Sequence, residues 1–327
     1  MEPKICAVIF LLLLIFRAES VSLSYDFYHQ SCPQLEHIVR AEVESASVLD
    51  PTTPAALLRL MFHDCQVQGC DGSILLDPDE RKVKFSETSS SKNFGIRKKE
   101  LIEVMKSTVE AVCPRKVSCS DIIVLAAQEA VALSGGPTIN VRLGRRDSPN
   151  PPNLTLVDAS LPSADTDVDT MLRIFAAKGM SVQESVAILG AHTLGTTHCV
   201  NLKSRLYGRR KDNKAQIPAA AKPGFLNALR VQCPVGPTAQ AVGMVQNDLT
   251  SVLFDNQYFV GSASGLGVLD IDAQMPVDPR TRPHVETFAV DVATFFRAFT
   301  SAFVKLSQSN VLTGDRGVIR ESCRTLY

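Results

Sequence analysis

Arg59 and His63 are four positions apart in a segment with helical apolar spacing, so their side chains share one face of the helix. An imidazole can accept and return a proton, and a neighbouring guanidinium can stabilise negative charge that develops on a small ligand. Taken alone, the pair is more typical of a helix-surface arginine next to a core histidine. We therefore regard it as a candidate acid–base site that needs support from other residues.

A second histidine, His192, lies in the small-residue segment from Gly190 to Gly195. This segment follows a helix for which Ser181 and Glu184 predict a capping box. Small neighbours leave room for a flat, bulky group to approach the imidazole ring, and haem iron held by one histidine is the leading candidate. The alternative is a structural histidine near a helix C-terminus, where the helix dipole favours it.

Oxygen-bearing residues follow His63 directly, in a loop around a glycine. Ca²⁺ prefers several oxygen ligands at about 2.3–2.6 Å from a flexible loop, supplied by carboxylates, hydroxyls and backbone carbonyls. The spacing is not that of an EF-hand, so a solvated turn is the alternative. The candidate ligands are Asp64, Val67, Gly69, Asp71 and Ser73.

Helical apolar spacing dominates the elements that must position these residues, which predicts a mainly α protein with few short strands. A strand-like stretch occurs at Thr138–Leu143. Loop-rich regions at about 65–96 and 144–165 separate two helical lobes that we expect to share one core. Helices are predicted near residues 35–43, 54–61, 98–112, 119–134, 167–178, 181–190 and 285–307.

The first residues resemble a secretory signal. Lys4 precedes an apolar run over residues 5–16, which is too short to span a bilayer. Small residues at Ala18, Ser20 and Ser22 predict cleavage there, so residues 1–22 are expected to be a signal peptide and 23–327 the mature domain. We therefore expect a secreted protein without a membrane span.

The composition excludes one large class of partner. The 34 basic and 34 acidic side chains balance, so there is no basic excess to bind nucleic acid. The hydrophobic content of 45% is that of a folded globular chain.

Cysteine usage agrees with an oxidising compartment. Of nine cysteines, Cys6 would leave with the signal, and the remaining eight suggest four disulfides among about 105 pairings. Only Cys65 and Cys70, separated by four residues, are favoured locally. No Cys-x-x-Cys pair occurs, which disfavours zinc. The only sequon begins at Asn153 in a proline-rich stretch, where glycosylation is expected.

Together these residues bring a family resemblance into view. The segments 59–65 and 69–76 resemble the distal segment of the plant secretory (class III) haem peroxidases. Further segments similar to that family follow in the same order and extend the resemblance over nearly the whole mature chain. They are residues 117–121, 143–148, 190–195, 254–256, 278–281 and 322–324.

The resemblance implies a haem-peroxidase fold in which two helical lobes enclose haem b. His63 then matches the distal acid–base residue, Arg59 its partner, and Asn93 the residue that orients it. His192 matches the iron ligand and Asp272 the carboxylate that accepts its N–H. Two further positions border the haem in this reading, Phe62 next to the distal histidine and Pro162 near the exposed haem edge.

The resemblance also implies two calcium sites. Asp64, Val67, Gly69, Asp71 and Ser73 match the first. The second would use Thr193, Asp248, Leu253 and Asp255, with a hydroxyl from Ser251 or Thr250 because the chain is one residue short there. The family's disulfide pairs would be Cys32–Cys113, Cys65–Cys70, Cys119–Cys323 and Cys199–Cys233.

The function implied by the resemblance is a secreted peroxidase that reduces hydrogen peroxide to water and oxidises phenolic donors in one-electron steps. Family members act in hydrogen peroxide catabolism, the oxidative-stress response and cell-wall phenolic oxidation, and we expect a monomer. The chain departs from the family pattern at Gln66, Gln68 and residues 97–99.

Those departures motivate one alternative, a haem-binding protein of the same fold that has lost turnover. A hydrolase that uses His63 and Asp64 is disfavoured, because adjacent helical residues point in different directions and no Gly-x-Ser-x-Gly motif occurs.

Overall fold

The computed structural model describes residues 22–79, 82–208, 221–236 and 242–326. The expected signal peptide, residues 1–22, therefore lies outside the described residues except for its last position. Within the described part helices predominate and the named strands form one two-stranded sheet, so the mainly α prediction is confirmed. No helix in this part is long and apolar enough to cross a membrane.

Four helices form the N-terminal lobe: α1 (Leu35–Leu49), α2 (Thr53–Val67), α3 (Lys99–Val112) and α4 (Cys119–Leu133). The helix α4 is apolar on nearly all sides, and α1, α2 and α3 pack around it. Pro54 occupies the first turn of α2, where its missing N–H costs nothing. This helix, which carries Arg59 and His63, is thus anchored to the centre of the lobe.

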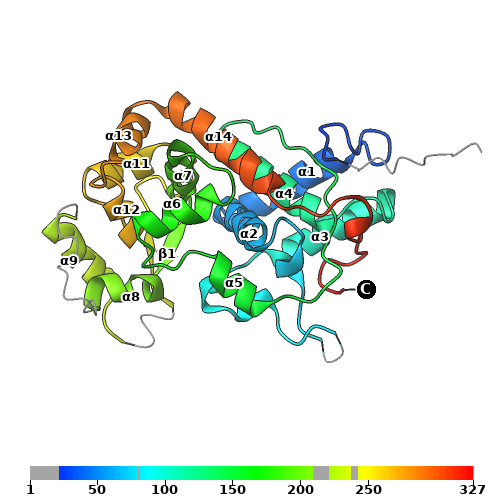
Figure 1. Ribbon diagram of the computed structural model, residues 1–327, viewed down its shortest axis with the longest axis horizontal. Coiled ribbons are helices and arrows are strands. Elements are labelled where there is room, and N and C mark those ends of the chain that lie inside the picture. Colours follow the sequence, from blue (N-terminus) through cyan, green and yellow to red (C-terminus); the bar gives the residue numbers. More distant parts are fainter. Residues whose placement is uncertain (1–21, 80–81, 209–220, 237–241, 327) are drawn as a thin grey trace, which may run out of the picture.

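The remaining helices form the second lobe and the helix that joins both. Figure 1 shows α1, α3 and α4 on one side, α8, α9 and α11 to α13 on the other, and α14 running over the centre. The helix α14 packs against both α7 and α2. These helices are α5 (Leu154–Ser160), α6 (Val168–Ala176), α7 (Val182–Leu189), α8 (Cys199–Tyr207), α9 (Pro223–Gln232), α11 (Gln257–Ala263), α12 (Asp270–Gln274), α13 (Arg282–Val290) and α14 (Val292–Gln308).

Short 3₁₀ turns and one small sheet complete the fold. The turns are η1 (Ser73–Leu75), η2 (Glu87–Ser89), η3 (Ser91–Asn93), η4 (Gly190–Thr193) and η5 (Gly314–Arg316). The strands β1 (Thr196–His198) and β2 (Met244–Gln246) pair antiparallel, with Thr197 opposite Val245. This pairing holds the segment that follows η4 against the loop before α11.

Buried phenylalanines form the core under η4. The ring centroids of Phe254 and Phe299 are 4.7 Å apart, and those of Phe259 and Phe295 are 4.9 Å apart. Each fully buried ring of this size contributes about 1.5–3 kcal/mol to folding. Gly190 lies directly on this cluster, since a Cβ there would be 2.4 Å from the Phe295 ring. The turn that carries His192 therefore packs at close range on the core.

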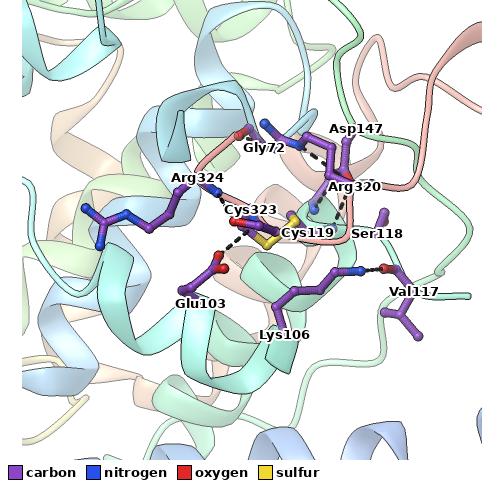
Figure 2. The surroundings of a disulfide bond; sticks show 12 residues. Gly72, Glu103, Lys106, Val117, Ser118, Cys119, Asp147, Arg320, Cys323 and Arg324 are labelled. Carbon is purple, nitrogen blue, oxygen red and sulfur yellow. Dashed lines mark hydrogen bonds and ion pairs between the residues drawn. A yellow bond between two sulfur atoms is a disulfide. The ribbon is translucent and has the colours of Figure 1, made fainter. Parts of the chain in front are cut away.

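The described part of the chain contains four disulfides: Cys32–Cys113, Cys65–Cys70, Cys119–Cys323 and Cys199–Cys233. Figure 2 shows the third of them, with Arg320 extending from the C-terminal segment to Gly72. The Arg320 side chain donates to the Gly72 carbonyl at 2.6 Å, and Asp147 accepts from the backbone N–H groups of Cys119 and Arg320. The C-terminus is thus joined to the N-terminal lobe.

Three local expectations are wrong. The helix expected over 285–307 is broken, because Asp291 leaves the helical conformation (φ −128°) and caps α14 through the Thr294 N–H at 2.9 Å. The expected loop at 144–165 contains α5, whose N-terminus Asn153 caps. Among the described residues the strand-like stretch Thr138–Leu143 makes an isolated bridge, from Leu143 to Ser24, in which the two backbones exchange both hydrogen bonds.

Candidate active site

The pair Arg59–His63 lies on one face of α2 as its spacing predicts. Arg59 Nε donates to His63 Nε2 at 3.2 Å, and a second Arg59 nitrogen donates to the carbonyl of Phe94 at 2.9 Å. Burial and repulsion from Arg97 lower the pKa of Arg59 to about 10, so its guanidinium stays charged at neutral pH. A fixed positive charge therefore lies beside the imidazole.

The other ring nitrogen of His63 is held from η3. His63 Nδ1 lies 2.6 Å from Asn93 Oδ1, and the Asn93 amide donates to the carbonyl of Glu87 at 2.9 Å. This assigns the amide oxygen as acceptor, so Nδ1 carries the proton and Nε2 the lone pair. Burial, reinforced by the charge of Arg59, lowers the pKa of His63 to about 3. The imidazole is consequently neutral and able to accept a proton at Nε2.

The unusual residues 97–99 contact neighbouring elements without disturbing Asn93. Arg97 and Lys98 both pair with Asp50, at 3.1 and 2.8 Å, and Lys99 pairs with Asp77 at 3.0 Å. Lys98 adopts a left-handed conformation (φ 70°) as it caps α3. The departure in sequence is thus accommodated at the start of α3, where Arg97 is exposed and Lys99 is buried.

His192 lies in η4, directly after α7, where Ser181 and Glu184 form the expected capping box. Its Nδ1 is 3.1 Å from Oδ1 of Asp272, a residue of α12. Although burial acts in the opposite direction, His192 and the other donors around Asp272 lower the pKa of that carboxyl. Of the two ring nitrogens of His192, Nδ1 alone has a hydrogen-bond partner among the described residues. The other nitrogen, Nε2, is therefore available to a metal.

The segment after His192 packs against the segment that carries Arg59. A Cβ on Gly195 would lie 2.9 Å from the Cβ of Ala55, one turn before Arg59 on α2. A Cβ on Gly95 would lie 2.6 Å from His198 Nε2 and 3.4 Å from an Arg59 nitrogen. The segment that follows His192 and the helix that carries Arg59 and His63 therefore meet at this contact.

These donors fit a haem. An imidazole with a free Nε2, fixed through Nδ1 by a carboxylate, is the usual form of a proximal iron ligand. His192 keeps 30% of its side chain exposed while Asp272 is 2% exposed, so the carboxylate is inside and the imidazole is presented outward. On the other lobe His63 and Arg59 supply the proton acceptor and the positive charge.

The first group of candidate calcium ligands is brought together at the end of α2. Asp71 Oδ1 accepts from the Ser73 N–H at 3.0 Å, and Asp64 Oδ2 accepts from the Gly72 N–H at 3.1 Å. The Ser73 hydroxyl donates to Glu87 at 2.6 Å. Burial, together with repulsion from Asp71 and Glu87, raises the pKa of Asp64 well above its ordinary value.

Asp64 Oδ1 in this group and Glu87 Oε2 beside it are buried and have no hydrogen-bond partner among the described residues. Burial also raises the pKa of Glu87 to about 7. Unpaired buried carboxylate oxygens are costly, and a bound cation removes that cost. Val67 ends α2 and Gly69 follows it, packed so closely that a Cβ would lie 2.5 Å from the Asn310 carbonyl oxygen.

The second group of candidate calcium ligands lies next to His192. The Thr193 hydroxyl contacts Asp248 at 2.7 Å and Asp255 at 3.1 Å. Burial and repulsion from Asp255 raise the pKa of Asp248. The hydroxyl that contacts both carboxylates from the shortened loop is that of Thr250, at 3.4 and 3.0 Å.

The other two members expected for this second group are placed differently. The backbone carbonyl of Ser251 accepts from the Gly195 N–H at 2.7 Å, and the Leu253 side chain is 51% exposed. Within the described ranges no cluster of three or more His, Cys, Asp or Glu side chains is arranged to hold a metal. Each expected calcium set contains two carboxylates and relies on hydroxyls and carbonyls for the rest.

The structure also describes three further expected residues, of which Phe62 adjoins His63. The Phe62 ring is 5.7 Å from that of His63 and 6.1 Å from that of Phe175. Pro162 is half-buried and follows Leu161, which packs with Val67 and Phe62. Asn153 is exposed at the start of α5, with its side-chain oxygen used in the cap.

Sequence reasoning missed residues whose roles depend on contacts between distant segments. Tyr258 donates to Asp272 at 2.7 Å, and burial raises the pKa of its hydroxyl well above the ordinary value. Two other missed residues lie near the Arg59–His63 pair: the Glu87 carbonyl accepts from Asn93, and His198 lies beside Gly95. The Tyr258 contact had no local signal, whereas Glu87 lies six residues before Asn93 and could have been suspected as a buried acid.

Comparison with known proteins gives this geometry its context. The family described as Peroxidase matches residues 39–291. Peroxidase 29 of Arabidopsis thaliana is 54% identical over 304 residues, which cover 92% of this chain and 88% of that protein. Peroxidase 18 of the same plant is 40% identical over 326 residues, covering 98% of this chain and 96% of that protein.

A mainly α fold with a histidine presented from each lobe thus occurs in a chain that belongs to the peroxidase family. It is a haem peroxidase that acts on hydrogen peroxide and on electron donors, and the prediction of a class III haem peroxidase is confirmed.

Proposed function

We propose that His63 moves the proton in peroxide reduction and that Arg59 stabilises the charge of O–O cleavage. The observation that carries this is the position of His63, with Nδ1 2.6 Å from Asn93 Oδ1 and Nε2 facing Arg59. The lone pair of Nε2 accepts a proton from hydrogen peroxide. The same nitrogen returns the proton to the departing oxygen, which leaves as water.

The bound haem supplies the electron exchange between peroxide and donors. The protein's part on the other side is to hold His192 through Asp272, which makes the imidazole a more basic ligand. Two phenolic donors then each lose one electron and one proton, so that one hydrogen peroxide gives two waters in all. We place the donors beside Pro162, at the exposed edge of the Arg59–His63 side.

We further propose haem b and two calcium ions as the cofactors. The unpaired oxygens of Asp64 and Glu87 support the first calcium site, with Asp64, Asp71, Ser73 and the carbonyls of Val67 and Gly69 as ligands. For the second we propose Thr193, Asp248, Thr250 and Asp255, with the Leu253 carbonyl. Thr250 replaces Ser251 as the hydroxyl ligand.

The expected processing completes the proposal. Residues 1–22 direct secretion, 23–327 form one monomeric haem peroxidase domain, and Asn153 carries a glycan. The exposure of Asn153 and the four disulfides support an extracellular protein. Cell-wall phenols would be the donors.

An absorption spectrum tests the function most directly. Purified haem-loaded protein should change its Soret band on addition of one equivalent of hydrogen peroxide and regain it on addition of a phenol such as guaiacol. In His63→Ala the first change should slow by about 10²–10⁴-fold, whereas exposed His37→Ala serves as control. Equal rates in wild type and His63→Ala would contradict the role of His63, and a spectrum unresponsive to peroxide would favour a haem protein without turnover.

A further inference from the structure

A single oxygen of Asp272 accepts hydrogen bonds from two different side chains. His192 Nδ1 lies 3.1 Å from Oδ1, and the hydroxyl of Tyr258 donates to the same Oδ1 at 2.7 Å. The other oxygen, Oδ2, accepts the Leu269 N–H at 2.8 Å. The shorter bond to Oδ1 is thus the one from the tyrosine.

Packing keeps the Tyr258 hydroxyl in place. The side chain is 3% exposed, and its ring stands edge-on to those of His192 at 5.6 Å and Phe259 at 4.9 Å. Asp272 is itself 2% exposed, so water does not exchange freely with either partner. The two donors therefore compete for one acceptor in a fixed arrangement of low polarity.

This competition bears directly on the imidazole. A carboxylate that accepts the N–H of a ligating histidine increases the negative charge on that ligand and favours the ferric state. An oxygen that already accepts a short bond from a hydroxyl has less charge to offer to the second donor. The tyrosine therefore opposes the effect of Asp272 on His192.

We propose that Tyr258 is a positioning residue that limits the charge that Asp272 passes to His192 and thereby sets the reduction potential of the haem iron. The inference rests on the proposed role of His192 as the iron ligand. It adds a control on that ligand which acts through Asp272 and makes no contact with hydrogen peroxide or a donor.

The test is the ferric/ferrous potential of the haem-loaded Tyr258→Phe variant, measured by spectroelectrochemical titration. With the hydroxyl removed, Oδ1 of Asp272 accepts a hydrogen bond from His192 only. We expect the ferric/ferrous equilibrium to shift about tenfold toward the ferric state. For this one-electron couple the shift corresponds to a reduction potential lower by about 59 mV. The iron–histidine stretching frequency of the ferrous protein should rise in parallel, because the ligand becomes more anionic.

Tyr28→Phe is the matched control. Tyr28 is similarly buried and donates to a buried carboxylate, Asp121, at 2.8 Å, but in the N-terminal lobe. This variant loses a comparable hydrogen bond and should keep the wild-type potential. A variant with 3-fluorotyrosine in place of Tyr258 retains the ring and hydroxyl with a stronger donor, so its potential should rise.

The outcomes separate this inference from the proposed function. An unchanged or raised potential in Tyr258→Phe, or the same fall in Tyr28→Phe, overturns the inference. Should Tyr258→Phe not fold, a 3-fluorotyrosine protein with an unchanged or lowered potential overturns it. The role of His192 is tested apart from this: it fails if His192→Ala keeps the wild-type ferric spectrum and iron–histidine stretch.

Discussion

His63 is held at both ring nitrogens, and this determines what it can do. Asn93 Oδ1 accepts a hydrogen bond from Nδ1–H at 2.6 Å, and Arg59 Nε donates to Nε2 at 3.2 Å. Because burial and the arginine charge lower its pKa to about 3, the imidazole is a weak base that returns an accepted proton readily. His192 is held at one nitrogen only, so its other nitrogen can bind iron.

The pH dependence of the reaction with peroxide should follow from this pKa. Only neutral His63 can accept the proton, so the rate should stay constant from pH 7 to about 5 and fall as the pH approaches the pKa of about 3. In Arg59→Leu the loss of the positive charge should raise the pKa of His63 and move this fall to higher pH. The rate at pH 7 should also drop by about 10²–10³-fold, because the developing charge loses its partner.

Stopped-flow absorbance against pH measures both effects. Arg282→Leu, which removes an exposed arginine of α13, is the control and should reproduce the wild-type profile. An Arg59→Leu profile with its acid limb at or below the wild-type position would be inconsistent with the charge interaction.

The proposed second calcium site offers a test between the neighbouring hydroxyls of Thr250 and Ser251. Thr250→Val removes the hydroxyl that contacts Asp248 and Asp255, so calcium affinity should fall by at least about tenfold, which is about 1.4 kcal/mol. Ser251→Ala is the matched control and should bind calcium as the wild type does. Titration calorimetry on chelator-treated protein measures both, and a larger loss in Ser251→Ala would reverse the assignment.

At the scale of elements, α2 and η4 carry the residues proposed for the chemistry and are held by different means. The helix α2 presents Arg59 and His63 on one face and Asp64 on another, so one helix serves both the acid–base pair and the first calcium group. The turn η4 is positioned by the capping box of α7 and by the close packing of Gly190 on Phe295. The location of His192 therefore depends on the core.

Adding one methyl group under η4 should be costly. A Cβ at position 190 would lie 2.4 Å from the Phe295 ring, so Gly190→Ala should lower the free energy of unfolding by about 1–3 kcal/mol. Gly224 in α9 has nothing within 4 Å of its Cβ position, and Gly224→Ala should equal or exceed wild-type stability by up to about 1 kcal/mol. Urea unfolding followed by circular dichroism compares them, and equal stabilities would argue against the close packing.

At the scale of the whole molecule, the C-terminal segment is bonded to the N-terminal lobe. The Cys119–Cys323 disulfide joins residues 204 positions apart, and Arg320 reaches the Gly72 carbonyl beside the first calcium group. Figure 2 shows both contacts in one view. The last residues of the chain thus support a loop close to its beginning.

The disulfides should differ in their contribution to stability. In the chain-entropy description a bond that closes 204 residues contributes about 5 kcal/mol, whereas one that closes five contributes about 2 kcal/mol. Replacing Cys119 and Cys323 by serine should therefore lower the melting temperature more than replacing Cys65 and Cys70. Differential scanning calorimetry of the two double variants gives the comparison, and the reverse order would point to native-state effects at the Cys65–Cys70 loop.

Local pattern was enough to place the helices that carry the site. The spacing of Arg59 and His63 follows from the helical period alone, and the capping box before His192 is readable within four residues. The break at Asp291 and the helix α5 were missed, because a single capping side chain decides them. The four disulfide pairs match those implied by the family resemblance, although spacing alone favoured only one.

The amino-acid sequence by itself determined the helical class, the placement of Arg59 and His63 on one helix face and the family, since these rest on residue types and short spacings. Only the tertiary structure decided that Tyr258 shares Asp272 with His192, that Thr250 contacts both Asp248 and Asp255, and that Gly195 meets Ala55. The physical reason is that such contacts join segments distant in the chain or depend on side-chain direction. Packing of the whole core, and no local preference, brings them within hydrogen-bond range.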